Sequence, residues 1–266
     1  MRPIIRWNLW SRRWSTRWWS VGIAAFAALE LSVYSSVKSQ AAQLNQALAH
    51  LPGSVKSLFG ANTDLFSPVG YLNSRLFYLL LPLMLSILAI GLGSSLIARE
   101  ETEGTIELIV GRPISRARFV LSKALSGLIV LAIVSILSAG AIMLLVKLVK
   151  LPVPLPYVAF ATAMAAVLAG FFGAIAFFVS CLDARGRGAS IAVASLVGLG
   201  SYIVASLEGD VHWLKWPARL LPYHYYNPTT ILSGHYAWLT MCWYGAMVLV
   251  LGILSWLAFR YRDIGG

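Results

Sequence analysis

A segment rich in charged residues, Ala98 to Lys123, interrupts this very apolar chain and reads AREETEGTIELIVGRPISRARFVLSK. It contains five basic and four acidic side chains and lies between two long apolar segments. Charged side chains are costly in the hydrocarbon of a bilayer, so we expect the segment to form a polar loop at a membrane face. We interpret it as a structured loop that docks on another protein.

The order of residues within this loop predicts a very short helix held between two breaks. Gly104 interrupts the helix that continues from the preceding apolar segment. Thr105 can cap the next helix, which has Glu107 in its first turn. Gly111 can adopt the left-handed conformation that ends a helix, and Pro113 prevents its continuation. A helix of little more than one turn is unstable alone, so it needs a partner surface.

The residue pattern alone leaves two interpretations of this loop open. In the first, the apolar Ile106, Ile109 and Val110 dock on another protein. In the second, the loop packs on its own chain through ion pairs. The acidic members would be Glu100, Glu101, Glu103 and Glu107, and the basic members Arg99, Arg112, Arg116 and Arg118. In either case Ser115 is expected to cap the helix that follows.

Composition predicts an all-α integral membrane protein. Apolar residues make up 59% of the chain, mean hydropathy is +0.76, and charged residues make up 12%, against roughly 25% in soluble domains. A spanning helix needs about 20 apolar residues, and barrel strands would alternate apolar and polar residues. Six segments qualify as spanning helices: Trp18 to Val37, Leu76 to Ala98, Leu121 to Val146, Tyr157 to Leu182, Ala189 to Leu207 and Leu239 to Phe259.

The distribution of basic residues predicts the orientation of these spans. With the N-terminus inside, 14 of the 21 Lys and Arg residues fall on the cytoplasmic side, as short cytoplasmic loops require. Both termini are therefore expected in the cytoplasm of a multi-pass protein of the cell (plasma or inner) membrane. The net charge of +11 is explained by this topology and by contact with membrane lipid, without nucleic acid.

The arm formed by residues 1–17 carries a basic stripe beside an aromatic stripe. At about 100° per residue the two sets occupy adjacent faces of a helix. Arginine tips that reach headgroup phosphates beside buried indoles are typical of a helix lying in the membrane surface. The alternative is a partly disordered basic tail whose indoles anchor the first span. The predicted interfacial anchors are Arg2, Arg6, Arg13, Arg17, Trp7, Trp10 and Trp14.

Inside the spans, Pro82 is expected to kink the second helix, because it removes a backbone donor and clashes with the preceding turn. Paired glycines such as Gly91 with Gly93 and Gly170 with Gly173 are expected to permit close helix packing. Glu30 is the acidic residue that lies well inside a predicted span. It either fastens the first helix to the bundle or lines a cavity that favours cationic substrates.

Several stretches together resemble the permease subunits of type 2 ATP-binding-cassette (ABC) exporters, such as bacterial drug, antibiotic or sodium efflux permeases. The most specific is the loop, through Glu100, Glu101, Gly104, Thr105, Glu107, Pro113, Ile114, Ser115 and Arg116. The others are LPGSVKSLFG at Leu51 to Gly60, SPVGYL at Ser67 to Leu72 and LPYHYYNPTTILSG at Leu221 to Gly234. The resemblance covers nearly the whole chain in order.

The resemblance implies one six-span permease domain over residues 1–266. Residues 1–17 would be its interfacial helix, 98–120 its cytoplasmic coupling loop, and 208–238 an outer loop with a re-entrant helical segment. It also implies a dimer with a second copy or a paralogous permease, and a cavity bordered by the first, second and fifth spans, which Glu30 would line in the second of its two predicted roles. The coupling residues would be Glu100, Glu101, Glu103, Gly104, Thr105, Ile106, Glu107, Ile109, Pro113, Ser115 and Arg116.

The energy source implied by this resemblance is a separate ABC ATPase subunit that binds ATP and Mg. The printed sequence contains no Gly-Lys dipeptide and hence no phosphate-binding G-x-x-x-x-G-K-[ST] loop. No cofactor, catalytic residue or metal ligand is expected in the chain itself, since His212, His224 and His235 lack metal-ligand spacing. The alternative functions are an ATP-independent ion channel or secondary transporter and, with less support, an intramembrane hydrolase or transferase.

Overall fold

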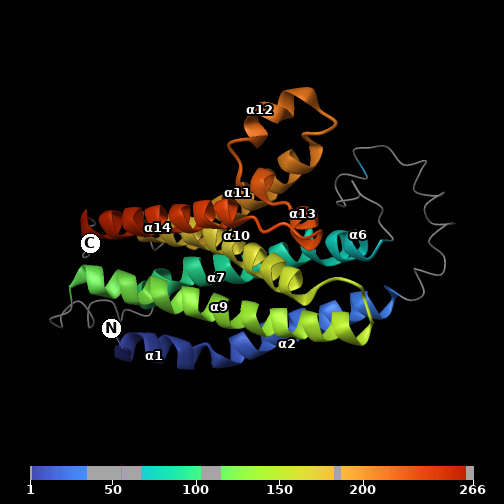
Figure 1. Cartoon of the computed structure of the whole chain (residues 1–266). Helices are drawn as coiled ribbons and strands as arrows, with labels where there is room; N and C mark the ends of the chain where they lie inside the picture. Colours follow the sequence, from blue (N-terminus) through green and yellow to red (C-terminus); the bar gives the residue numbers. More distant parts are fainter. Residues whose placement is uncertain (1, 35–54, 56–66, 103–114, 183–186, 262–266) are drawn as a thin grey trace.

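The computed structural model describes residues 2–34, 55, 67–102, 115–182 and 187–261, and the elements within them are helices. The long helices lie side by side in a bundle (Figure 1). The short ones gather at one end. The elements are α1 Arg2–Ser11, α2 Arg13–Ser32, α6 Pro68–Leu72, η1 Asn73–Phe77, α7 Leu80–Thr102, α9 Arg116–Leu148, α10 Leu155–Leu182, α11 Arg187–Leu207, η3 His212–Leu214, α12 Lys215–Ala218, η4 Pro222–Tyr225, α13 Pro228–Leu232 and α14 Trp238–Tyr261.

Among the described residues, five helical segments are long and apolar enough to cross a membrane. They correspond to the second to sixth predicted spans, and their ends lie within eight residues of the predicted ones. The segments are Pro68–Ile97, Arg116–Leu148, Leu155–Leu182, Arg187–Leu207 and Trp238–Tyr261. The predicted first span corresponds mainly to α2, which is not among the five. Arg17, Glu30 and the neighbouring indoles lower its hydropathy, and most of its last residues lie outside the described part of the chain.

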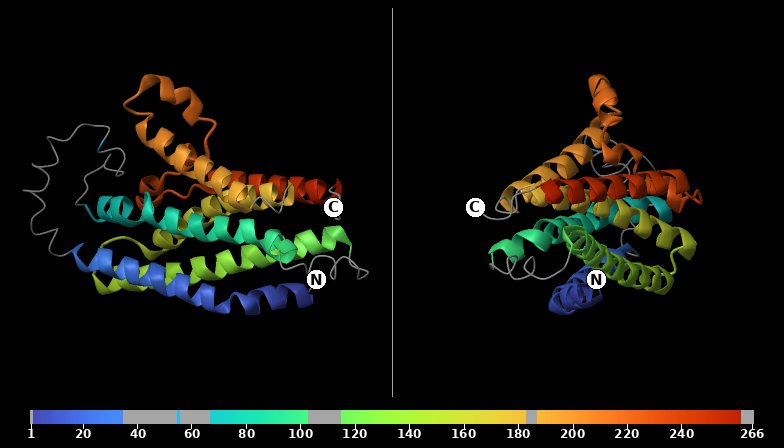
Figure 2. Two further views of the ribbon diagram at one scale, coloured as in Figure 1. Left: turned by 180° about the vertical axis from the view of Figure 1, so that it is seen from behind. Right: turned by 90° about the vertical axis from the view of Figure 1, so that its left-hand side faces the viewer.

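We call the end of the bundle that holds Thr102, Ser115 and Arg260 the loop end, and the opposite end the far end. Both chain termini lie at the loop end (Figure 1). The long helices run back and forth between the two ends, as expected for successive spans. At the far end α11 and α12 lean away from the bundle, whereas α13 returns to it (Figure 2).

The second span is one long helical segment with a break before its proline. Ser67 caps its start by accepting a hydrogen bond from the Gly70 amide at 3.0 Å. The turn that follows is a π-helix, in which the Tyr78 amide donates to the Asn73 carbonyl at 2.7 Å. A regular α-helix resumes with Pro82 in its first turn. A π-helical turn thus lies just ahead of Pro82, and the kink expected at Pro82 itself stays a prediction.

The closest helix packing joins α7 to α10 through small residues. A Cβ atom added to Gly173 would lie 2.8 Å from the Ala89 carbonyl oxygen, and one added to Gly93 would overlap the Gly173 carbonyl oxygen. The two backbones therefore approach as closely as they do because these positions carry no side chain. The predicted packing role is found for one glycine of each pair, Gly93 and Gly173, whereas a Cβ atom added to Gly91 would meet no atom within 4 Å.

Candidate functional site

The predicted coupling residues lie at and beyond the two helix ends that bound residues 98–120. Glu100 and Glu101 belong to the last turn of α7, which continues to Thr102. Ser115 caps α9 as predicted, because its hydroxyl accepts from the Arg118 amide at 3.4 Å. The described helices thus extend into both ends of the predicted loop. The remaining coupling residues lie outside the described residues: Glu103, Gly104, Thr105, Ile106, Glu107, Ile109 and Pro113.

The start of α9 is fastened to the end of α14. Arg116 donates a hydrogen bond from Nη1 to the Arg260 carbonyl oxygen at 3.2 Å. One turn further in, the buried rings of Phe119 and Phe259 lie 5.9 Å apart between centroids. The start of the third span and the end of the last span are thus in direct contact. The sequence analysis did not identify Phe259 or Arg260 as part of this junction.

The N-terminal helices are attached to the same end of the bundle by two polar contacts. Lys123 on α9 is 3% exposed and donates from Nζ to the Asn8 side-chain oxygen at 3.2 Å. Arg12, at the junction between α1 and α2, donates from Nη2 to the Ser95 hydroxyl on α7 at 2.8 Å. The sequence analysis counted Lys123 and Arg12 only as topology signals. Their partners, Asn8 and Ser95, have no sequence pattern that would reveal them.

The predicted aromatic stripe is exposed in the structure. Trp7, Trp10, Trp14 and Trp18 are between 56% and 70% exposed. The Arg13 guanidinium lies 4.1 Å from the Trp10 ring centroid. However, α1 runs nearly in line with α2 along the flank formed by α9, and does not turn across the bundle (Figures 1 and 2). Its placement in the plane of a membrane stays a prediction, as does the anchoring role of Arg2, Arg6 and Arg17.

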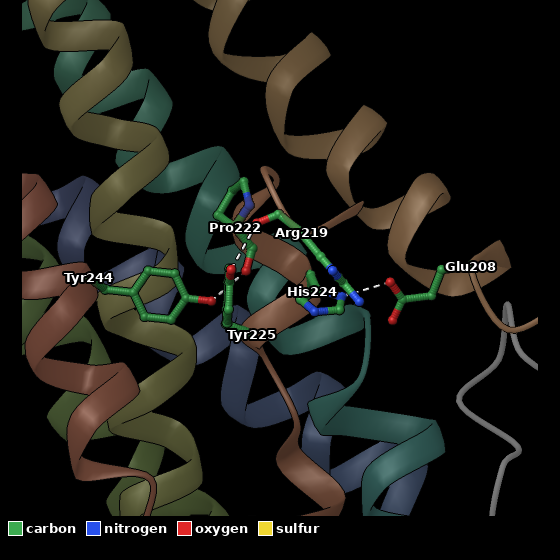
Figure 3. Close-up of polar contacts among 6 residues, drawn as sticks. All are labelled: Glu208, Arg219, Pro222, His224, Tyr225 and Tyr244. Atoms are coloured by element: carbon green, nitrogen blue, oxygen red, sulfur yellow. Dashed lines mark hydrogen bonds and ion pairs between the residues drawn. The ribbon is translucent and has the colours of Figure 1, made fainter. Parts of the chain in front are cut away.

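At the far end, the segment between the last two long helices folds into short helices held by side-chain contacts (Figure 3). His224 Nδ1 lies 2.6 Å from Glu208 Oε2, which ties η4 to the residue that follows α11. Tyr244 on α14 donates its hydroxyl to the Pro222 carbonyl oxygen at 2.6 Å. The His224 ring is thus engaged in fastening this segment.

Two buried tyrosines fasten the same segment to the break in the second span. The Tyr223 hydroxyl donates to the Tyr78 carbonyl oxygen at 2.6 Å, and the Tyr226 hydroxyl donates to the Phe77 carbonyl oxygen at 2.7 Å. In a regular α-helix the Tyr78 carbonyl would accept from residue 82, but Pro82 has no amide hydrogen. Burial raises the pKa of the Tyr223 and Tyr226 hydroxyls well above the ordinary value for tyrosine, so both remain protonated donors. The sequence analysis missed this pairing.

Glu30 lies near the far end of α2, where its backbone is fastened to the second span. The Glu30 carbonyl oxygen accepts a hydrogen bond from the Tyr71 hydroxyl at 2.6 Å. The Tyr71 ring also packs edge-on against Tyr34, with the centroids 4.9 Å apart. The Glu30 residue is half-buried. Its position between the first and second spans agrees with either of the two predicted roles and does not decide between them.

The family model described as "ABC-2 family transporter protein" matches residues 4–263, which is nearly the whole chain. No curated protein matches the chain. The helical architecture with several apolar helices long enough to cross a membrane agrees with this match. The chain therefore belongs to the ABC-2 transporter family of membrane proteins.

Proposed function

We propose that the chain is the membrane-spanning permease subunit of an ATP-driven ABC exporter, with its loop end and both termini in the cytoplasm. Two copies, or one copy and a paralogous permease, form the translocation pathway. Separate ATPase subunits bind ATP and Mg and supply the energy. The family match over residues 4–263 carries this proposal. The geometry of the loop end supports it.

That geometry supports transmission of force from residues 98–120 into the whole bundle. The segment leaves α7 and enters α9, so a partner that moves it acts on two spans directly. The Arg116 contact extends the connection to α14, and the Lys123 and Arg12 contacts extend it to α1 and α2. Packed elements move as units and do not deform continuously. Closure of an ATPase on ATP would therefore displace several helices together.

The exposure of the last two spans supports assembly with a second copy. In their most apolar stretches α11 is 28% buried and α14 is 17% buried within the chain, compared with 61% for the segment Pro68–Ile97. Large apolar side chains such as Leu196 and Leu249 are therefore exposed. Lipid and a second permease subunit are the two surroundings that such faces suit in a membrane.

A pair of loop variants tests the coupling role. Glu107→Ala and Arg116→Ala are expected to lower transport, and to lower either ATPase assembly or substrate-stimulated ATP hydrolysis, with little change in substrate affinity. Arg187→Ala is the matched control, because Arg187 is an exposed arginine at the start of α11, away from the loop contacts. Normal transport by both loop variants would contradict the coupling role.

The alternative functions give different results in liposomes that contain the chain alone. A channel or a secondary transporter would move ions across the bilayer without any ATPase subunit or ATP. The proposed exporter subunit is expected to show no ATP-independent flux, and to transport only when the ATPase and Mg-ATP are both supplied. Ion flux through the purified chain alone would contradict the exporter proposal and would support a channel or a secondary transporter.

A further inference from the structure

The loop half of the bundle contains an apolar cavity of about 400 Å³ between α7, α9, α10 and α14. This volume lies in the range of small-molecule sites, about 300 to 1,000 Å³. Its walls include Gly93 and Gly173 from the close α7–α10 contact, Leu121 on α9, and Gly252 and Trp256 on α14. A Cβ atom added to Gly252 would meet no atom within 4 Å, so the cavity is open at this position.

The length of the cavity matches one leaflet of a bilayer. Along α9 its lining extends from Ala117 to Leu131. The 14 helical steps between these two residues cover about 21 Å at 1.5 Å per step. Half of a bilayer is about 20 to 22 Å thick when headgroups are included. The cavity therefore has the height of one phospholipid, measured from the loop end toward the middle of the bundle.

Positive charge lies at the loop end of this cavity. Arg116 immediately precedes the lining residue Ala117, and its guanidinium reaches the Arg260 backbone at 3.2 Å. The Arg260 guanidinium lies 5.8 Å from the ring centroid of Trp256, which itself lines the cavity. Trp256 and Ala117 line the loop end of the cavity, and the guanidinium groups of Arg116 and Arg260 lie beside this end. This order of apolar, aromatic and cationic groups matches the polarity order of a phospholipid. Arginine is well suited to bind a phosphate, since its planar donors pair with two oxygens.

We propose that this cavity is a binding site for a resident anionic phospholipid of the leaflet at the loop end. One acyl chain lies between α9 and α14 and packs against the α7–α10 contact. Arg116 and Arg260 bind the phosphate. The lipid completes the packing of four helices beside the proposed coupling loop. The cavity shares α7, part of the second span, with a pathway bordered by the first, second and fifth spans, but no described residue of α2 or α11 lines it. The proposal depends on neither the substrate nor the ATPase.

Native mass spectrometry with cavity-filling variants tests the apolar part of the site. The full chain is reconstituted into vesicles of phosphatidylglycerol or of phosphatidylcholine and then extracted in mild detergent. Its mass under native conditions shows whether a lipid molecule stays bound. We expect the wild type to retain phosphatidylglycerol and Gly252→Phe to lose it. Gly245→Phe should retain it. Gly245 lies two turns away on the same face of α14, outside the cavity, and also has no atom within 4 Å of an added Cβ.

A second pair of variants tests the charged part without filling the cavity. Arg260→Gln should lower phosphatidylglycerol retention at least ten-fold. Arg187→Gln removes an arginine from α11 that is also exposed, and it should leave retention unchanged. The folding of Gly252→Phe is checked by its elution volume and by thermal unfolding. If this variant does not fold, the comparison of Arg260→Gln with Arg187→Gln tests the proposal alone. The proposal is overturned if both lipids are retained equally, if Gly252→Phe retains phosphatidylglycerol, or if Gly252→Phe abolishes dimerisation with no lipid bound to the wild type.

Discussion

The hydroxyl of Tyr223 is predicted to compensate for the amide hydrogen that Pro82 lacks. Tyr223 is 6% exposed, and its hydroxyl lies 2.6 Å from the Tyr78 carbonyl oxygen. Tyr223→Phe removes the hydroxyl that donates to the Tyr78 carbonyl oxygen. The helix cannot replace this donor, because Pro82 has no amide hydrogen. Loss of a hydrogen bond to a buried polar group costs about 1 to 3 kcal/mol. Tyr225→Phe is the control: Tyr225 is 42% exposed and donates to the Arg219 carbonyl oxygen, so its loss should cost less than about 0.5 kcal/mol.

A double-mutant cycle isolates this effect from other consequences of the substitution. Pro82→Ala restores an amide hydrogen that can donate to the Tyr78 carbonyl oxygen. In the Pro82→Ala background the cost of Tyr223→Phe should therefore fall toward that of the Tyr225 control. The expected coupling between the two sites is about 1 kcal/mol or more, within the range for residues that share a partner.

The free energies of unfolding are measured by titration of mixed micelles with sodium dodecyl sulfate, followed by far-ultraviolet circular dichroism. All four proteins of the cycle are compared at the same detergent composition and protein concentration. Additive effects of Pro82→Ala and Tyr223→Phe would refute the reasoning. If Tyr223→Phe and Tyr225→Phe lowered the free energy of unfolding equally, the reasoning would also be refuted. The burial of the Tyr223 hydroxyl would then add nothing to its effect on stability.

Three further predictions concern pH, packing and charge. Above about pH 10 the tyrosines of the unfolded chain lose their protons, whereas buried Tyr223 and Tyr226 keep theirs because burial raises their pKa, so the free energy of unfolding falls as pH rises. Replacing both tyrosines by Phe should make this fall shallower, as measured by the same detergent titration. Gly93→Ala should cost about 1 to 3 kcal/mol by overpacking, whereas Gly252→Ala should stay within about 0.5 kcal/mol; equal unfolding midpoints would contradict this. Glu30→Gln should assemble normally and weaken transport of cations relative to neutral substrates, while an unchanged profile leaves only the fastening role.

The spans were predictable from the sequence because hydrocarbon imposes a strong composition signal. Ser67 was not identified as a cap, but Ser115 was, because it lies two residues after Pro113 and shortly precedes a long apolar run. The first span was the weakest case. Its Arg17 and Glu30 dilute the apolar signal, and α2 is recognisable as part of the bundle mainly through its packing along α9.

The contacts that join the helices were not predictable, since they depend on residues far apart in the chain. The Tyr223 bond connects residues 145 positions apart, and the Arg116 bond connects residues 144 positions apart. Pro82 indicated that a carbonyl would lack its helical donor, but no local pattern indicated which side chain would supply it. The apolar cavity likewise arises from four helices and from glycines whose sequence signal indicated only close packing.

The mass of the purified complex tests the central claim most directly. The chain is expressed together with a candidate ABC ATPase subunit and purified through a tag on the chain alone. The mass of the complex is then measured by native mass spectrometry, and its ATP-dependent transport is assayed. We predict an active complex of two permease chains and two ATPase subunits, which loses transport when the ATPase is removed. A stable complex that transports without any ATPase subunit would contradict the account.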